Sequence, residues 1–473
     1  MDENEIRRGR PAVDGPASAA AGEALRRAAG EASPARGSHG VERLKRWLVP
    51  AIGVLALAGY AAVYGFKLNG PPIRSDAVGY YAYLPSYLLR HDPWFERIGP
   101  LLRRHGYAAT DEPPAWTGLQ PVAGTGRRLD QYTIGEAVLL LPFFALAHAV
   151  ACAAGVAPDG FTWPYQFAVS LAGLAYALLG LYLTQRLLAR WFSARVVAAT
   201  LCCLCFGTNL FHYATYDSAL SHAFSFCAVT ALLAVIPRWY QNPSWRTSAS
   251  LGAVCAAVAL IRPTNAVAFV AVPLFRIAGV SDLGARRRWL LAHRPAVALA
   301  AATALLVFSP QLLIWHGATG SWLVNPHLGA GFEFLSPRVF KVLFSVRKGL
   351  FFWSPLLLLA VAGLWPMRRL AREWLAPTVA ALALGTWVIA SWHAWAYGGS
   401  FGHRGFVDLY AFFALGLASL FATLRSVRAR WTVGAVAAVL IALSIFQMVQ
   451  YWKGIIPFDN TTWELYRRVF LRL

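Results

Sequence analysis

Long apolar runs separated by short arginine-rich stretches constrain this chain more than any other feature. A helix that crosses a bilayer needs about 17–25 apolar residues. Runs of that length occur at 47–66, 163–185, 196–212, 218–237, 295–315, 350–366, 374–391, 406–424 and 431–451. A further run, 248–277, is too long for one crossing and is interrupted by Arg262-Pro263-Thr264, which predicts two short helices, 248–261 and 264–277. The sequence therefore predicts an all-α, polytopic membrane protein with about eleven transmembrane helices.

The composition agrees with this prediction. Hydrophobic residues make up 58% of the 473 residues and charged residues only 14%, whereas soluble domains carry about 25% charged residues. These values exclude a soluble enzyme and a disordered chain. The net charge of +21 would suit a nucleic-acid partner. The basic residues lie between the apolar runs, however, so no nucleic-acid partner is expected.

Arginine clusters in the short loops predict the orientation. Such loops stay on the cytoplasmic side, and the clusters are Arg186/Arg190/Arg195, Arg238/Arg246, Arg286/Arg287/Arg288/Arg294, Arg368/Arg369/Arg372 and Arg425/Arg428/Arg430. All of them would fall outside if the apolar run 134–154 also crossed the membrane. We therefore expect 134–154 to be an interfacial helix within a large first outer loop, 67–162. The N-terminus is then cytoplasmic and the C-terminus lies outside.

The composition along the chain predicts a division into three segments. Residues 1–46 are rich in Ala, Gly, Pro, Arg and Glu, which predicts a disordered cytoplasmic tail. Residues 47–451 form the predicted transmembrane domain, and 452–473 form a short tail on the outer side. Arginine far outnumbers lysine, which suggests a bacterial source and hence the inner (cytoplasmic) membrane.

The first outer loop contains the first candidate site. Asp76 lies about ten residues past the end of the first span and two residues after Arg74, within Ser75-Asp76-Ala-Val-Gly79-Tyr80-Tyr81. An aspartate there can act as a general base or hold a metal. It can equally be the N-cap of a helix.

Two further carboxylates of this loop, Asp130 and Glu136, flank the start of the interfacial helix. We include both as candidate catalytic residues. The helix dipole explains Glu136 equally well, since it favours an acid in the first turn.

A glycine-rich turn near the C-terminus is the most informative segment. Gly399-Ser-Phe-Gly402-His403-Arg404 combines glycines, which let backbone N–H groups approach an anion, with a guanidinium that can bind phosphate in bidentate fashion. Arg347 and Lys348 in another outer loop add cations. These four residues (His403, Arg404, Arg347 and Lys348) predict a phosphate site, although outer cations also bind lipid headgroups non-specifically.

Three more residues each have a structural and a functional interpretation. Asp217 and His222 open the fourth span and can be a helix cap and a structural histidine, or an acceptor site with a second carboxylate. Arg262 lies at membrane depth, where an arginine either faces a partner or a cavity, or snorkels to the surface. No zinc spacing or P-loop motif occurs.

These features together resemble the C-type (GT-C) glycosyltransferases. The layout is similar to bacterial relatives of the protein O-mannosyltransferase and aminoarabinose transferase group. The matching stretches are Ser75-Asp76-Ala-Val-Gly79-Tyr80-Tyr81, Gln131-Tyr132-Thr-Ile-Gly135 before Pro142-Phe143, Arg347-Lys348-Gly349 with Ser354-Pro355, and Gly399-Ser-Phe-Gly402-His-Arg404. They cover about residues 47–450.

The resemblance implies a polyprenyl-phosphate sugar donor, with Asp76 as the catalytic acid and Arg404, with Arg347 or Lys348, on the donor phosphate. Many members have two adjacent acids, whereas Ala77 follows Asp76 here. A second carboxylate must then come from Asp130, Glu136 or Asp217. No cofactor is implied with certainty, and a divalent metal stays open.

The expected function is therefore that of an integral membrane hexosyl- or pentosyltransferase with a periplasmic active site. It would transfer the sugar to a cell-envelope glycan, lipid or protein, in contact with membrane lipids. The alternatives are a polytopic transporter or flippase, a lipid-linked glycan ligase, and a non-catalytic membrane partner.

Overall fold

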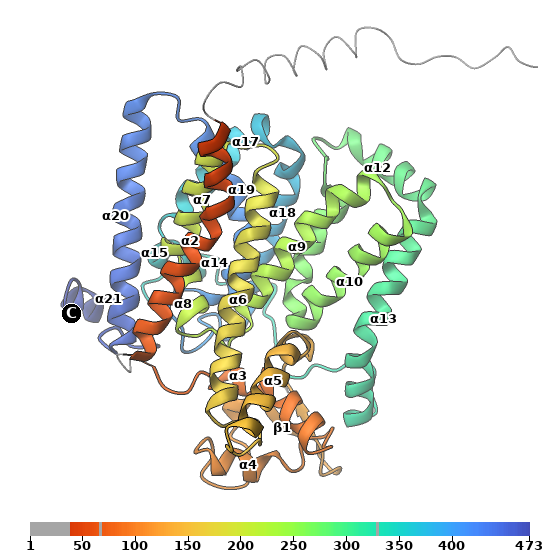
Figure 1. Ribbon diagram of the computed structural model, residues 1–473. Helices are drawn as coiled ribbons and strands as arrows, with labels where there is room; N and C mark the ends of the chain where they lie inside the picture. The colour runs from red at the N-terminus through yellow and green to blue at the C-terminus, as the bar shows by residue number, and fades with distance from the viewer. Residues whose placement is uncertain (1–37, 66–68, 328–330) are drawn as a thin grey trace, which may run out of the picture. The chain divides into compact units, whose positions relative to one another are not determined.

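The computed structural model describes residues 38–65, 69–327 and 331–473 (Figure 1). The chain divides into two units, 1–46 and 47–473. Most of the predicted disordered tail, 1–37, lies outside the described residues. Helix α2 (Ser38–Gly65) begins inside that tail, so the first helix starts earlier than the apolar run itself.

Eight helices of the described chain are long and apolar enough to cross a membrane, as a multi-pass membrane protein requires. They are α2, α5 (Gly135–Ala153), α6 (Trp163–Leu188), α9 (His222–Gln241), α13 (Arg294–Thr319), α18 (Leu375–Ser391), η5 (Arg404–Leu409) continuing into α19 (Tyr410–Ala422), and α20 (Val427–Trp452). Only three shorter apolar helices accompany them in the described residues. The eight long and three short helices are not the eleven predicted spans, because they include α5, which is predicted not to cross, and lack 350–366. The number of about eleven spans stays a prediction.

Several predicted spans are broken. The run 196–212 is split at Gly207 into α7 (Ala194–Phe206) and α8 (Leu210–Thr215). The run 350–366 becomes α15 (Leu350–Trp353), α16 (Leu357–Ala362) and α17 (Leu364–Leu370). Pro355 causes the first of these breaks, because proline lacks an N–H group and moves the preceding residue out of the helical region. The predicted continuous span over 350–366 is wrong.

The break within 248–277 is confirmed at the predicted place. Helix α10 (Trp245–Ile261) ends at Arg262, whose backbone is extended, and Pro263 starts the 3₁₀ helix η3 (Pro263–Val270). A short α11 (Ala271–Leu274) follows. The second piece is thus mainly 3₁₀ and not α-helical.

The described part of the predicted first outer loop, 69–162, is folded. It contains α3 (Asp76–Leu84), the π-helical turn η1 (Pro85–Leu89), α4 (Ile98–Arg104), η2 (Ala115–Thr117) and a small antiparallel hairpin. Its strands β1 (Leu119–Pro121) and β2 (Arg128–Asp130) pair in the register Leu119 opposite Asp130. Outside this loop lie the short helices α12 (Ser281–Ala292), α14 (Val339–Phe344), η4 (Arg372–Trp374) and α21 (Trp463–Val469).

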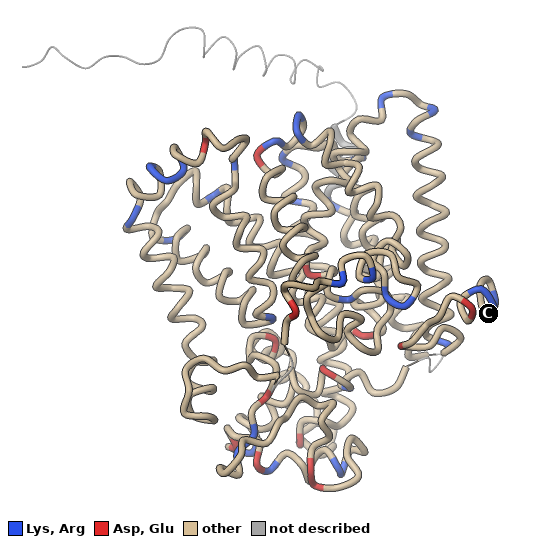
Figure 2. The backbone as a smooth tube through the Cα atoms, turned by 180° about the vertical axis from the view of Figure 1, so that it is seen from behind, with Lys and Arg blue, Asp and Glu red and all other residues tan. Residues whose placement is uncertain are grey.

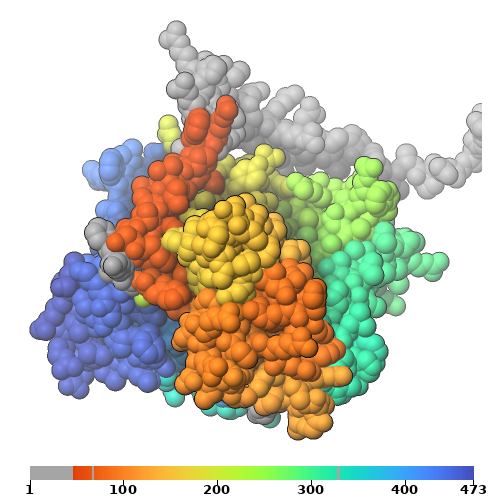
Figure 3. Space-filling model, turned by 60° about the horizontal axis from the view of Figure 1, so that its bottom comes forward, coloured from red at the N-terminus to blue at the C-terminus, as the bar shows by residue number. Residues whose placement is uncertain are grey.

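Many charged residues of the helical unit 47–473 lie at its two ends, and a further group lies between them (Figure 2). Helices α12 and α17 and the start of α20, which carry predicted cytoplasmic arginines, lie at one end (Figures 1 and 2). The first outer loop, with α3, α4 and β1, lies at the other end. Figure 3 looks onto that end, where the loop (orange) forms the centre of the face beside α6 (yellow). This arrangement agrees with the predicted division of the loops between two sides.

Helix α5 matches the predicted interfacial helix 134–154 within one residue at each end. It packs against α3, α6 and α10, and Figure 1 shows it at the end where the first outer loop lies. Its length and apolar composition would also allow a crossing. The interfacial assignment therefore stays a prediction.

Candidate functional site

A cavity of about 560 Å³ opens between the first outer loop and the helical core. Its walls come from five parts of the chain that are far apart in sequence: the start of α3, the turn before α5, the α10–η3 break, the segment around residue 325 and the segment 392–404. The residues that line it are Asp76, Tyr80, Gln131, Tyr132, Thr133, Ile261, Arg262, Pro263, Thr264, Val324, Asn325, Pro326, His327, Phe332, Trp392, His393, Ala394, Tyr397, Gly398 and Arg404.

An ion pair between Asp76 and Arg404 lies in the wall of this cavity. The Arg404 Nη1 atom is 2.8 Å from Asp76 Oδ2, and their side chains are 12% and 22% exposed. These two residues were singled out from the sequence, and the fold brings them into direct contact. Partial exposure leaves both accessible from the cavity.

Local backbone geometry sets the direction of Asp76. Ser75, and not Asp76, is the N-cap of α3, with φ of 51°, and its side chain makes no capping hydrogen bond. Asp76 is the first helical residue, so the predicted N-cap alternative is wrong for it. Its carboxylate lies at the positive end of the α3 dipole, which favours the ionised form.

The surrounding groups keep Asp76 ionised. Burial raises the pKa of its carboxyl, but the Arg404 guanidinium, a hydrogen bond from Tyr132 and the Arg262 charge lower it more. The pKa of Asp76 is therefore below its usual value. Paired with Arg404, this carboxylate is a weak base, and it becomes a stronger base when Arg404 moves to another anion.

Arg262 faces the cavity from the α10–η3 break. Its Nε atom is 3.6 Å from Asp408 Oδ2, and its Nη1 atom is 3.1 Å from His222 Nδ1. His222 Nδ1 is in turn 3.0 Å from Asp408 Oδ1. Of the alternatives for Arg262, the structure shows a partner and a cavity.

Sequence analysis missed Asp408, which is 2% exposed. It lies inside the predicted span 406–424, and an acid within such a run was a sufficient signal. The aromatic lining was missed as well. Tyr80 and Tyr132 pack with ring centroids 4.2 Å apart, and Trp392 contacts both His327 and Phe332.

Two of the predicted carboxylates lie behind the cavity wall. Glu136 is fully buried at the start of α5, and within the described residues neither carboxylate oxygen has a hydrogen-bond partner. The charges of Arg262 and Asp76 act on it. Asp130 is also buried, and its Oδ1 atom accepts a hydrogen bond from the Tyr132 N–H. Neither residue lines the cavity.

The other predicted phosphate ligands lie apart from the cavity lining. Arg347 forms a two-bond ion pair with Asp459, at 3.0 Å for each bond. Lys348 is buried and donates hydrogen bonds to the carbonyl oxygens of Ser400 and Phe458. Burial lowers the pKa of Lys348 to about 7. The structure therefore gives both cations structural partners.

His403 is buried and in contact with the Trp395 carbonyl, 2.9 Å from its Nε2 atom. Burial lowers the pKa of His403 to about 3, so the ring is neutral at pH 7 and has no positive charge for a phosphate. Of the four predicted phosphate ligands, only Arg404 lines the cavity.

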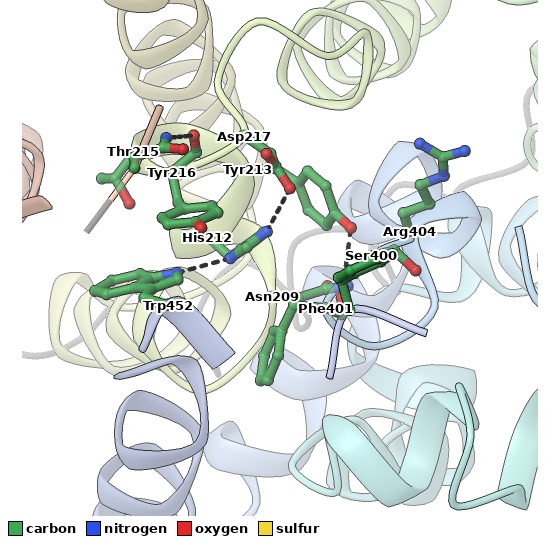
Figure 4. Close-up of polar contacts among 12 residues, drawn as sticks. Asn209, His212, Tyr213, Thr215, Tyr216, Asp217, Ser400, Phe401, Arg404 and Trp452 are labelled. Atoms are coloured by element: carbon green, nitrogen blue, oxygen red, sulfur yellow. Dashed lines mark hydrogen bonds and ion pairs between the residues drawn. The ribbon is translucent and has the colours of Figure 1, made fainter. Parts of the chain in front are cut away.

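Asp217 belongs to a different polar network, beside the cavity (Figure 4). Its Oδ1 atom is 2.6 Å from Arg74 Nη2, and its Oδ2 atom is 2.9 Å from His212 Nε2. His212 Nδ1 accepts a hydrogen bond of 2.9 Å from the Trp452 indole. Asp217 and His222, predicted together, have different partners, and neither lines the cavity.

The donor set does not fit a divalent metal. Within the described chain, no group of three or more His, Cys, Asp or Glu side chains is arranged to hold an ion. Asp76 has an arginine as its partner where a metal site needs further oxygen ligands. We therefore derive no step through a metal.

Comparison with protein-family models, curated proteins and solved structures finds no match for this chain. The chemistry must be inferred from the cavity itself. The site combines an ionised carboxylate, two guanidinium groups and aromatic walls. It can accept a proton from a hydroxyl, stabilise an anion and hold an organic ring.

Proposed function

We propose that this chain is an integral membrane glycosyltransferase that uses a polyprenyl-phosphate sugar on the outer face of the membrane. The observation that carries the proposal is the Asp76–Arg404 ion pair in the wall of a cavity at the first-outer-loop end. A carboxylate next to a phosphate-binding cation is the pair of groups that sugar transfer from a lipid phosphate needs.

The proposed reaction begins with an exchange of partners at Arg404. The donor phosphate binds Arg404 and weakens its contact with Asp76. Since Arg404 is a major cause of the low pKa of Asp76, its withdrawal makes this carboxylate a stronger base. Binding of the donor phosphate thereby activates the base in the cavity where the sugar is to be transferred.

Transfer then proceeds by attack of the acceptor oxygen on the anomeric carbon. The new carbon–oxygen bond forms as the bond between the sugar and the phosphate oxygen breaks. Asp76 takes the proton of the acceptor hydroxyl, and the electron pair leaves on the lipid phosphate. Arg404 and Arg262 stabilise the charge that develops there.

The test compares Asp76→Asn and Arg404→Lys with the wild type. We expect Asp76→Asn to lower sugar transfer by about 10²–10⁴-fold, the usual contribution of a general base. Arg404→Lys keeps the charge but loses the bidentate geometry, and we expect a loss of about 10²-fold. Mass spectrometry of envelope glycans in a complemented deletion strain identifies the transferred sugar and measures both losses.

Asp111→Asn is the matched control. Asp111 lies in the same outer loop and also pairs with an arginine, at 3.0 Å from Arg103, but its side chain is 53% exposed and does not line the cavity. This variant should transfer sugar like the wild type. Full complementation by Asp76→Asn would contradict the proposal.

One observation favours a second candidate, a transporter or flippase. The His222–Asp408–Arg262 cluster is buried where one helix is broken, as substrate sites of transporters often are. Uptake of a labelled substrate into proteoliposomes, lost in Asp408→Asn and without sugar transfer, would support this candidate.

A further inference from the structure

The segment 209–217, which contains α8, contacts the chain next to both partners of the Asp76–Arg404 ion pair. We propose that this segment is a positioning element that sets the relative placement of Asp76 and Arg404. Asp217 acts on the Asp76 side and Asn209 on the Arg404 side. Neither side chain lines the cavity, so both are positioning residues.

On the Asp76 side, the segment holds the backbone just before the carboxylate. Asp217 Oδ1 accepts the 2.6 Å hydrogen bond from Arg74, whose guanidinium also lies over the Tyr216 ring at 4.9 Å. Asn69 Nδ2 donates to the Tyr216 carbonyl at 2.6 Å. The chain before Asp76 is thereby fixed at two points.

Ser75 shows why this fixation is needed. It lies between Arg74 and Asp76 with φ of 51° and ψ of −138°, a positive-φ conformation that is unfavourable for a residue other than glycine. Such a conformation persists when the residues around it are held in place. The Arg74–Asp217 ion pair supplies that constraint.

On the Arg404 side, the same segment holds the Phe401 carbonyl. Asn209 Nδ2 donates to this oxygen at 3.0 Å, and the Tyr213 hydroxyl at 3.4 Å (Figure 4). The Asn209 Oδ1 atom accepts a hydrogen bond from Tyr410. Both hydrogen-bonding ends of the buried Asn209 amide are used, so the turn that leads to Arg404 starts from a fixed point.

A hydrogen-bonded chain makes the centre of the segment rigid. An indole nitrogen only donates, so Trp452 fixes His212 Nδ1 as an acceptor. The proton of a neutral His212 is then on Nε2, which donates to Asp217 Oδ2. Both Asp217 oxygens are therefore engaged, one by His212 and one by Arg74, and the carboxylate has a single orientation.

The first experiment measures local hydrogen–deuterium exchange of the full-length purified protein, without any assay of activity. Asp217→Asn should raise exchange at 73–78, where the Ala77 and Val78 N–H groups donate to Arg74 and Ser75 carbonyls. Asn209→Ala should raise exchange at 399–406. Arg74→Lys keeps the positive charge but loses the two-pronged hydrogen bonding of the guanidinium group. If Asp217→Asn does not fold, Arg74→Lys tests the expected rise in exchange at 73–78.

Glu373→Gln is the matched control, because Glu373 forms a comparable ion pair with Arg276, at 2.9 Å, outside this network. It should leave both peptides unchanged. Unchanged exchange at 73–78 in Asp217→Asn and Arg74→Lys, or at 399–406 in Asn209→Ala, would overturn the positioning role. A uniform rise over the whole chain in both Asp217→Asn and Arg74→Lys would also overturn it.

The second experiment rests on the proposed function. We expect Asp217→Asn to lower kcat for sugar transfer by about 10- to 100-fold, as for a small misplacement of a reacting group, with KM changed less than about two-fold. Partial recovery in Asp217→Glu would support positioning by the carboxylate. If the wild type transfers sugar and Asp217→Asn changes local exchange without lowering kcat, the expected effect of this segment on catalysis is overturned. If the wild type transfers no sugar, the proposed function fails while the exchange result still stands.

Discussion

At the residue scale, Asp130 shows how burial alone changes what a carboxyl group can do. It is 1% exposed, and within the described chain its Oδ2 atom has no hydrogen-bond partner. Burial raises the pKa of this carboxyl well above its ordinary value, outweighing the hydrogen bond from Tyr132. The raised pKa favours the protonated form of Asp130, whereas sugar transfer needs an ionised base.

We expect Asp130→Asn to keep sugar transfer within about three-fold of the wild type. An unfolded aspartate ionises near pH 4, so between that pH and the raised pKa of the folded state the folded chain binds the extra proton. Wild-type stability therefore falls as the pH rises. Asp130→Asn removes this dependence while its amide oxygen can still accept from Tyr132. Its melting temperature should equal or exceed that of the wild type at about pH 8.

Asp130→Ala is the comparison, because it also removes the acceptor of the Tyr132 N–H group. It should melt below the wild type at about pH 5 and at about pH 8. Melting curves of the purified variants give both results. A loss of transfer of about 100-fold in Asp130→Asn would show that Asp130 belongs to the catalytic site after all.

Local sequence patterns predict some residues of the site, but not those whose partners are distant in sequence. Asp76, Arg262 and Arg404 could be selected because each is a charge at an unusual place in an apolar or glycine-rich stretch. Tyr132 and Asp408 depend on partners far along the chain, so their neighbourhood in sequence does not reveal what they contact. For the same reason, Arg347 and Lys348 were predicted as free cations, although the fold gives them partners.

At the element scale, close backbone contacts hold the central helices together. A Cβ atom on Gly416 of α19 would lie 2.2 Å from the Ala360 carbonyl oxygen of α16. A Cβ atom on Gly363 would lie 1.8 Å from the Gly416 carbonyl oxygen. Small residues allow this approach between apolar helices, and no rotamer change can relieve a clash with a backbone atom.

Gly416→Ala should lower the free energy of unfolding by about 1–3 kcal/mol, the usual effect of overpacking. Gly434→Ala on α20 is the matched control, since nothing lies within 4 Å of its Cβ position. It should be neutral or slightly stabilising, because alanine favours helix more than glycine. Equal melting temperatures for the two variants in one detergent would contradict the packing argument.

Helix positions were predictable where hydropathy and length suffice. The bounds of α18 and α20 differ from the predicted runs by a few residues. The breaks near Pro355 and Gly207 were missed because an apolar run is the same whether or not the backbone continues as one helix. The break at Arg262 was found because a charge and a proline coincide there.

At the scale of the whole molecule, the arginine clusters and the cavity suggest opposite sides of a membrane. Thr125 of the first outer loop and Ser281 of α12 are both exposed. Helix α12 and the strand β1 of that loop lie at opposite ends of the helical unit (Figure 1). We expect Thr125→Cys to react with an impermeant maleimide on intact spheroplasts, and Ser281→Cys only after the membrane is opened. Peptide mass spectrometry separates these thiols from the natural cysteines, and the reverse pattern would invert the proposed orientation.

The two residues of the ion pair are synthesised at different times. Asp76 and Arg404 are separated by more than 300 residues, and a chain grows at about 5–20 residues per second. The aspartate therefore leaves the ribosome roughly 20 seconds to one minute before its partner exists. During this interval the carboxylate has Tyr132 and later Arg262 nearby but lacks its ion-pair partner, Arg404. A chain that stops before the last quarter would carry the acid without its cation and would be inert.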